Sequence, residues 1–117
     1  MTMILRTAAL LAFTFAATAV ASAPVGHAAA GKAKATTVCS ACHGADGNKT
    51  LDGSYPRLAG QYPDYLSKAL HDYKSGKRKN PIMMGQAQGL SDQEIADLTA
   101  YFGALPGEIH DLSGHAR

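Results

Sequence analysis

The apolar residues of this chain are gathered near its N-terminus, which limits the core that the rest of it can build. Residues 8–23 carry no charge and consist mostly of Ala, Leu, Phe and Val. They hold a large share of the 46% of the sequence that is hydrophobic. Without them roughly 90 of the 117 residues remain, a size at which folding often needs help from outside the side-chain core.

The N-terminal segment has the pattern of a signal peptide. Arg6 supplies a positive charge, and residues 7–20 form an apolar run shorter than the about 20 residues that span a bilayer. Small residues fit the cleavage rule, and we expect cleavage after Ala21 or after Ala30. The sequence therefore predicts a signal peptide over 1–21, its cleavage point open between these two positions, and export to the periplasm without stable membrane insertion. An uncleaved N-terminal anchor is the alternative.

Three segments follow the signal peptide. Residues 22–31 are rich in Ala, Ser and Pro without a periodic pattern, and predict a flexible lead-in. Residues 32–106 predict one small domain. Residues 107–117 also lack periodicity and are predicted to be a C-terminal tail.

The sequence of this domain predicts an all-α fold of three to four short helices joined by long loops. No alternating strand pattern is present. Ser91 and Glu94 have the spacing of a capping box, which marks the start of the last helix. Gly and Pro residues predict loops over 44–61 and 77–89. Three helices are predicted, over 32–38, 62–74 and 91–104.

Cys39, Cys42 and His43 form the pattern C-x-x-C-H, the attachment signature of a c-type haem. Two thiols three residues apart can each add to one of the two vinyl groups of a haem. The residue that follows offers an imidazole nitrogen to the iron. A covalently bound haem would supply the apolar centre that this chain lacks, and residues able to cover it are Leu58, Leu66, Leu70 and Leu98.

Other interpretations of this pattern are less favoured. A thioredoxin-like redox pair belongs next to a βαβ unit, and the sequence predicts none. Zinc would need further Cys or His ligands at metal spacing, whereas the remaining histidines are scattered. A purely structural cysteine pair remains possible.

A second iron ligand is expected, because electron carriers commonly add a methionine thioether to the histidine. Outside the signal peptide the only methionines are Met83 and Met84, which lie together in the polar Gly/Pro-rich segment before the last helix. His71 is the other possible ligand, but it lies opposite the tyrosine stripe of its helix, where a solvated histidine is expected.

Four ordered segments resemble class I c-type cytochromes, and the resemblance covers about residues 32–105. It is strongest to small bacterial single-haem members and to one half of the periplasmic di-haem cytochromes. This chain departs from the di-haem proteins because it has one C-x-x-C-H and no second half, which implies one haem c. The segments are CSACHGADG at 39–47, YPRLAGQ at 55–61, NPIM at 80–83 and LSDQEIADLTAYF at 90–102.

The resemblance implies a role for each matched residue. Cys39 and Cys42 would form the thioether bonds, His43 would be the proximal iron ligand, and Met83, with Gly85 in register, would be the distal one. Met84 is adjacent and is kept as the alternative.

Residues around these ligands are also implied by the resemblance. The Pro56 carbonyl would accept a hydrogen bond from the proximal imidazole, and Arg57 would pair with a haem propionate or remain at the surface. The segment before Cys39 would pack against Tyr101 and Phe102, because the first and last helices cross in this fold.

The resemblance implies an electron carrier rather than an enzyme, with transient redox proteins as donor and acceptor. The alternative is a haem-bearing subunit of a periplasmic oxidoreductase complex, and a third possibility is a haem catalyst or sensor with an open iron site. The net charge of +2 argues against a nucleic-acid partner. Either a monomer or a weak dimer is expected. Lys74, Lys77, Arg78 and Lys79 form a basic cluster that would steer an acidic partner or serve only solubility.

Overall fold

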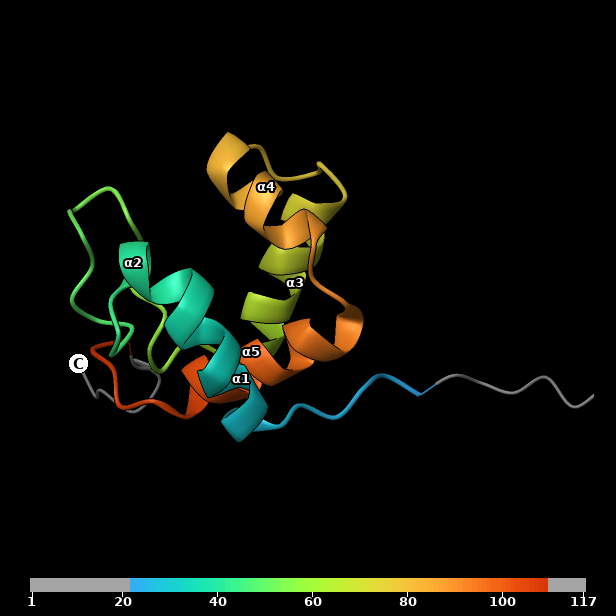
Figure 1. Cartoon of the computed structure of the whole chain (residues 1–117), viewed down its shortest axis with the longest axis horizontal. Helices are drawn as coiled ribbons and strands as arrows, with labels where there is room; N and C mark the ends of the chain where they lie inside the picture. Colours follow the sequence, from blue (N-terminus) through green and yellow to red (C-terminus); the bar gives the residue numbers. More distant parts are fainter. Residues whose placement is uncertain (1–21, 110–117) are drawn as a thin grey trace, which may run out of the picture.

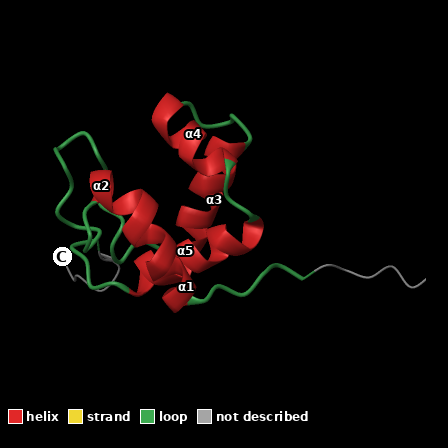
Figure 2. Ribbon diagram, in the orientation of Figure 1, coloured by secondary structure: helices red, strands yellow, loops and turns green. Residues whose placement is uncertain are grey.

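The computed structural model describes residues 22–109, and all regular structure within that range is helical (Figure 2). The all-α prediction is therefore confirmed. The predicted signal peptide and most of the predicted C-terminal tail lie outside the described residues. Within residues 22–109 no helix has the length and apolar character needed to cross a bilayer.

The first helical stretch is continuous and carries both cysteines. It consists of α1 (Ala28–Lys34), a π-helical segment η1 (Ala35–Cys39) and α2 (Ser40–His43). Helix α1 starts before the predicted position at Lys32, because the run of alanines at 28–30 favours helix strongly. Residues 28–31 are thus helical instead of belonging to a flexible lead-in.

Helix α3 (Pro63–Lys74) matches the predicted second helix. Pro63 occupies its first turn, where the missing N–H costs no hydrogen bond. The helix ends at Ser75, and Gly76 follows with a positive φ of 75° that turns the chain away.

Helix α4 (Pro81–Gln88) was not predicted, and the loop expected over 77–89 is wrong for these residues. Asn80 starts the helix, because its side chain accepts a hydrogen bond from the backbone N–H of Met83 at 3.1 Å. Pro81 again suits the first turn. The helix is short and has no apolar stripe, so the periodic pattern that marks the other helices is missing here.

Helix α5 (Asp92–Ala104) lies in the lower part of Figure 1, where α1 crosses it. The predicted capping box is present: the Ser91 hydroxyl accepts from the Glu94 N–H at 3.1 Å, and the Glu94 carboxylate accepts from the Ser91 N–H at 2.9 Å. The buried core around α5 is formed by Ala35, Leu66, Leu90, Ile95, Leu98 and Phe102.

Helix α1 crosses α5 at very close range, as Figure 1 shows. A Cβ atom built on Gly31 would lie 2.0 Å from the carbonyl oxygen of Asp97 and 2.9 Å from Cβ of Tyr101. Only a residue without a side chain fits there. Lys34 and Glu94 join the two helices through an ion pair at 2.8 Å. The segment before Cys39 therefore packs on the last helix, as expected.

The chain just before α1 also lies on α5. The backbone N–H of His27 donates to the Asp97 carboxylate at 2.7 Å, and the Gln93 side chain donates to the Val25 carbonyl at 2.7 Å. These bonds fix the start of the fold. The side-chain core itself is small. Among the described residues, Ile95 is the one large side chain that is completely buried.

Candidate functional site

A cavity of about 390 Å³ lies between η1 and α2 on one side and helices α3, α4 and α5 on the other. Its volume lies in the range of small-molecule and cofactor sites. Most of its wall is apolar, including the four leucines expected to cover a haem. The main apolar side chains of the wall are Leu58, Leu66, Leu70, Leu90, Leu98 and Phe102.

Both cysteines of the C-x-x-C-H pattern line this cavity as free thiols. Cys39 ends η1 and Cys42 lies in α2. Burial raises the pKa of the Cys39 thiol, and the nearby Lys34 ammonium opposes that rise. A π-helical turn adds about one residue to a helical turn. Because of this extra residue, the Cys39 side chain points in a different direction from the one it would have in an uninterrupted α-helix.

His43 lies at the wall of the same cavity and is buried, with 6% of its surface exposed. Its Nδ1 atom lies 2.8 Å from the Pro56 carbonyl oxygen. Because a carbonyl only accepts, Nδ1 carries a proton, and in a neutral imidazole Nε2 then keeps its lone pair. The hydrogen bond thus favours the tautomer that suits a metal ligand.

Tyr55 is a site residue that the sequence reasoning missed. Its ring meets the His43 ring edge-on, with centroids 6.3 Å apart and planes at 81°. Repulsion from the Cys42 sulfur when its thiol is ionised, and after it a hydrogen bond to that sulfur, raise the pKa of Tyr55. The available signal was its position directly before Pro56, which the motif at 55–61 contains.

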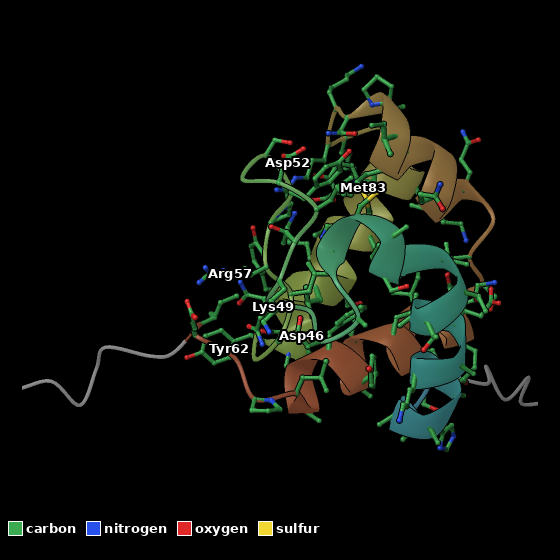
Figure 3. All side chains as sticks on the ribbon, turned by 60° about the vertical axis from the view of Figure 1, so that its left-hand side comes forward. Asp46, Lys49, Asp52, Arg57, Tyr62 and Met83 are labelled. Carbon is green, nitrogen blue, oxygen red and sulfur yellow. The ribbon has the colours of Figure 1, made fainter. Side chains whose placement is uncertain are left out.

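Met83 and Met84 point to different places. Met83 lines the cavity, and Figure 3 shows its sulfur between α4 and the helical stretch that carries the cysteines. Met84 is absent from the cavity wall. Its terminal methyl lies 3.9 Å from where a Cβ on Gly76 would be, beside the turn after α3.

His71 lies on the outer face of α3 and does not reach the cavity. Its Nδ1 atom lies 2.8 Å from the Ser67 carbonyl oxygen, and its Nε2 atom lies 3.5 Å from the Asp92 carboxylate. Both nitrogens are therefore engaged at the surface, in agreement with the solvated histidine expected there.

The charged residues of the cavity wall are all basic. Lys34, Arg57 and Arg78 line it, and no carboxylate does. The Arg78 guanidinium lies 4.9 Å from the centroid of the Tyr73 ring, and a hydrogen bond with the Tyr65 side chain raises the pKa of Arg78. The cavity therefore favours an occupant with an apolar body and acidic groups.

A second cavity of about 690 Å³ is wide open to solvent and has a different character. Figure 3 shows Asp46, Lys49 and Arg57 on this side of the molecule. Arg57 lines both cavities and pairs with Glu108. No cysteine, histidine or methionine is among the residues that line this second cavity, so it offers no soft ligand for iron.

The first cavity fits a haem by the chemistry of its donors. It brings two thiols, one imidazole with a free Nε2 and one thioether to a common apolar space. Its basic residues complement the two carboxylates of the porphyrin edge. Within residues 22–109, no three His, Cys, Asp or Glu side chains converge to hold a metal ion on their own.

This chain is similar to several known proteins. The family model described as Cytochrome c matches residues 28–105. Cytochrome c4 of Pseudomonas aeruginosa is 56% identical over 77 residues, which are 66% of this chain and 37% of the relative. Cytochrome c-554(548) of Halomonas halodenitrificans is 48% identical over 80 residues, which are 66% of this chain and 94% of the relative.

Two further comparisons bear on fold and partners. The crystal structure of reduced cytochrome c4 from Pseudomonas stutzeri superposes with a TM-score of 0.66 at 40% identity, covering 73% of this chain and 48% of that one. The cytochrome subunit of sulfide dehydrogenase from Chlorobaculum tepidum is 38% identical over 72 residues, covering 62% of this chain and 64% of the relative. The chain thus spans about half or less of the length of the cytochromes c4 that it matches, from 37% to 52%.

Proposed function

Residues 28–105 place this chain in the cytochrome c family, and from that membership we propose that it carries single electrons through one haem c. The haem supplies the redox chemistry, because its iron exchanges one electron between Fe(II) and Fe(III). The observation that carries the proposal is the single cavity wall shared by Cys39, Cys42, His43 and Met83.

The chain's own residues hold the group and close the site. Cys39 and Cys42 would hold it through their sulfur atoms, and His43 and Met83 would be the protein ligands of its iron. The hydrogen bond from His43 Nδ1–H to Pro56 keeps Nε2 available and raises the basicity of the ring. With His43 and Met83 both assigned to the iron, no position would remain for a substrate, which supports a carrier rather than an enzyme.

The cavity mouth provides the surface for redox partners. Val38, Tyr65 and Ile82 line the cavity and remain exposed at 37%, 50% and 56%. Basic side chains flank this apolar rim. A partner with an acidic rim around an apolar patch would dock there briefly, through the small interface typical of electron-transfer encounters.

The proposed place of action is the periplasm. The N-terminal pattern of a signal peptide supports export of the chain. Haem attachment and electron transfer would then both occur outside the inner membrane.

An oxidised absorption spectrum of the purified protein tests this function. Methionine ligation gives a weak thioether-to-iron charge-transfer band. We expect the band in the wild type and in Met84→Ala, and its loss in Met83→Ala. Carbon monoxide binding to the reduced wild type at neutral pH would contradict the carrier, because it requires an open iron site.

A second candidate is a permanent haem subunit of an oxidoreductase complex. The similarity to the cytochrome subunit of a sulfide dehydrogenase favours it. The haem site and its redox chemistry would be the same as in a carrier, but the partner protein would stay bound. Purification from the native host separates the two: a carrier elutes alone, whereas a subunit elutes with its dehydrogenase in constant proportion.

A further inference from the structure

Tyr55 and Pro56 both contact His43. The Pro56 carbonyl accepts from His43 Nδ1–H at 2.8 Å. The Tyr55 ring meets the His43 ring edge-on, with the two ring planes at 81°. Two consecutive loop residues thus restrain one residue of the haem-binding motif, His43.

Each contact restrains a different motion of the imidazole. A hydrogen bond from Nδ1 fixes where that atom lies, but it leaves the ring free to rock about the line through the bond. A ring packed edge-on at 81° limits this rocking, because it restricts the tilt of the imidazole plane. The two contacts therefore complement each other.

The loop that presents Tyr55 is itself tied to the motif. The Leu51 N–H donates to the Cys42 carbonyl at 2.9 Å, and the Tyr55 N–H donates to the Asp52 carbonyl at 3.3 Å. Asp52 also accepts from the Ser54 N–H at 2.7 Å. These bonds give the tyrosine ring a defined place relative to His43.

We propose that Tyr55 is a positioning residue that sets the orientation of the His43 ring and thereby tunes the reduction potential. The proposal rests on the proposed function, since it treats His43 as the iron ligand. A firm Nδ1–H bond makes the imidazole more basic and favours the oxidised iron. Loss of the tyrosine ring loosens that bond, so the reduction potential rises.

The test uses the haem-loaded protein and three variants at this position. Both Tyr55→Leu and Tyr55→Gln remove the aromatic ring. Because the site is half-exposed, the polar Tyr55→Gln variant serves as the test if Tyr55→Leu does not fold. Tyr55→Phe keeps the ring and removes the hydroxyl. Tyr62→Leu is the control, because Tyr62 is 53% exposed and does not line the cavity.

Two measurements are made on each variant. Proton NMR of the oxidised protein gives the hyperfine-shifted haem methyl resonances, whose order reports the plane of the axial imidazole. A spectroelectrochemical titration gives the reduction potential. A residue that only stabilises the fold would lower the melting temperature and move neither of these.

We expect Tyr55→Leu and Tyr55→Gln to change the methyl pattern and raise the potential, while Tyr55→Phe keeps the wild-type pattern and Tyr62→Leu changes neither. A folded, haem-loaded ring-less variant with wild-type pattern and potential would overturn the proposal. So would a Tyr55→Phe that behaves like Tyr55→Leu. Absence of the methionine band from the wild type would instead refute the proposed function, so the two failures are distinguishable.

Discussion

The Nδ1 atom of His43 lies 2.8 Å from the carbonyl oxygen of Pro56, thirteen residues further along the chain. This bond joins the end of α2 to the loop that follows it. It decides which ring nitrogen carries the proton and leaves the other for the iron. The long loop over 44–61 is therefore part of the site and not only a connection between helices.

Removal of the haem is expected to abolish cooperative unfolding. The haem-free double variant Cys39→Ala/Cys42→Ala keeps a cavity of about 390 Å³, and four of the core side chains line it: Leu66, Leu90, Leu98 and Phe102. Without an occupant these side chains lose their packing partners. Far-UV circular dichroism during heating should show a broad, gradual loss of helix.

The haem-loaded wild type is the control for this experiment, and it should unfold in one sharp transition. A sharp transition in the haem-free variant would contradict the expectation. It would show that α1, α3 and α5 form a sufficient core alone.

Gly31→Ala should destabilise the protein by about 1–3 kcal/mol through overpacking. The added Cβ would lie 2.0 Å from the Asp97 carbonyl oxygen, so α1 must move away from α5. Gly85→Ala is the matched control, because a Cβ there meets nothing within 4 Å and lies inside helix α4. It should be neutral or stabilise by up to about 1 kcal/mol. Urea unfolding of both haem-loaded variants checks this, and equal effects would refute the close-packing argument.

Asp97 should stabilise the fold in a pH-dependent way. The His27 N–H, and after it the Gln93 side chain, hold the pKa of Asp97 below its ordinary value. A lowered folded pKa gives stability that is present above the unfolded pKa of about 3.9, and that is lost as the pH falls through the folded pKa. Asp97→Asn keeps an acceptor but removes the charge.

The difference in unfolding free energy between wild type and Asp97→Asn should then be constant above about pH 5 and shrink below about pH 4. Urea unfolding across this range measures it. A difference that stays the same at all these pH values would show that the carboxylate charge contributes nothing.

The sequence predicted those parts of the fold that have local signals. The capping box at Ser91, the proline in the first turn of α3 and the spacing of apolar residues each depend on a few neighbouring residues. Helix α4 lacks such a signal, because Asn80 and Pro81 are typical of turns as well as of helix starts. Its helical state depends on its packing against α3, which local patterns do not contain.

The same distinction holds for the site. Haem attachment itself requires the spacing of Cys39, Cys42 and His43, so the sequence alone was enough to identify these residues. Met83 and Met84 are adjacent and chemically identical, and only the direction of each side chain separates them. Tyr55 was missed for a related reason, since its contact with His43 depends on how the loop folds back.

Lys77 and Lys79 should steer anionic partners to the cavity mouth. Of the basic cluster at 74–79, Lys74 donates to the Leu90 carbonyl at 2.5 Å and Arg78 packs on Tyr73, whereas Lys77 and Lys79 form no ion pair within residues 22–109. Lys77→Gln/Lys79→Gln should slow oxidation of the reduced protein by ferricyanide about two- to tenfold at low salt.

The salt concentration and the charge of the oxidant distinguish electrostatic steering from a general loss of reactivity. The difference between wild type and this double variant should vanish as ionic strength rises, because salt screens exposed charges beyond about 10 Å at 0.1 M. A cationic cobalt oxidant should react with the double variant as fast as with the wild type or faster. Lys49→Gln removes one charge beside the other cavity and should leave the ferricyanide rate nearly unchanged. Equal slowing by Lys49→Gln would mean that only the net charge matters, and that these two lysines serve solubility.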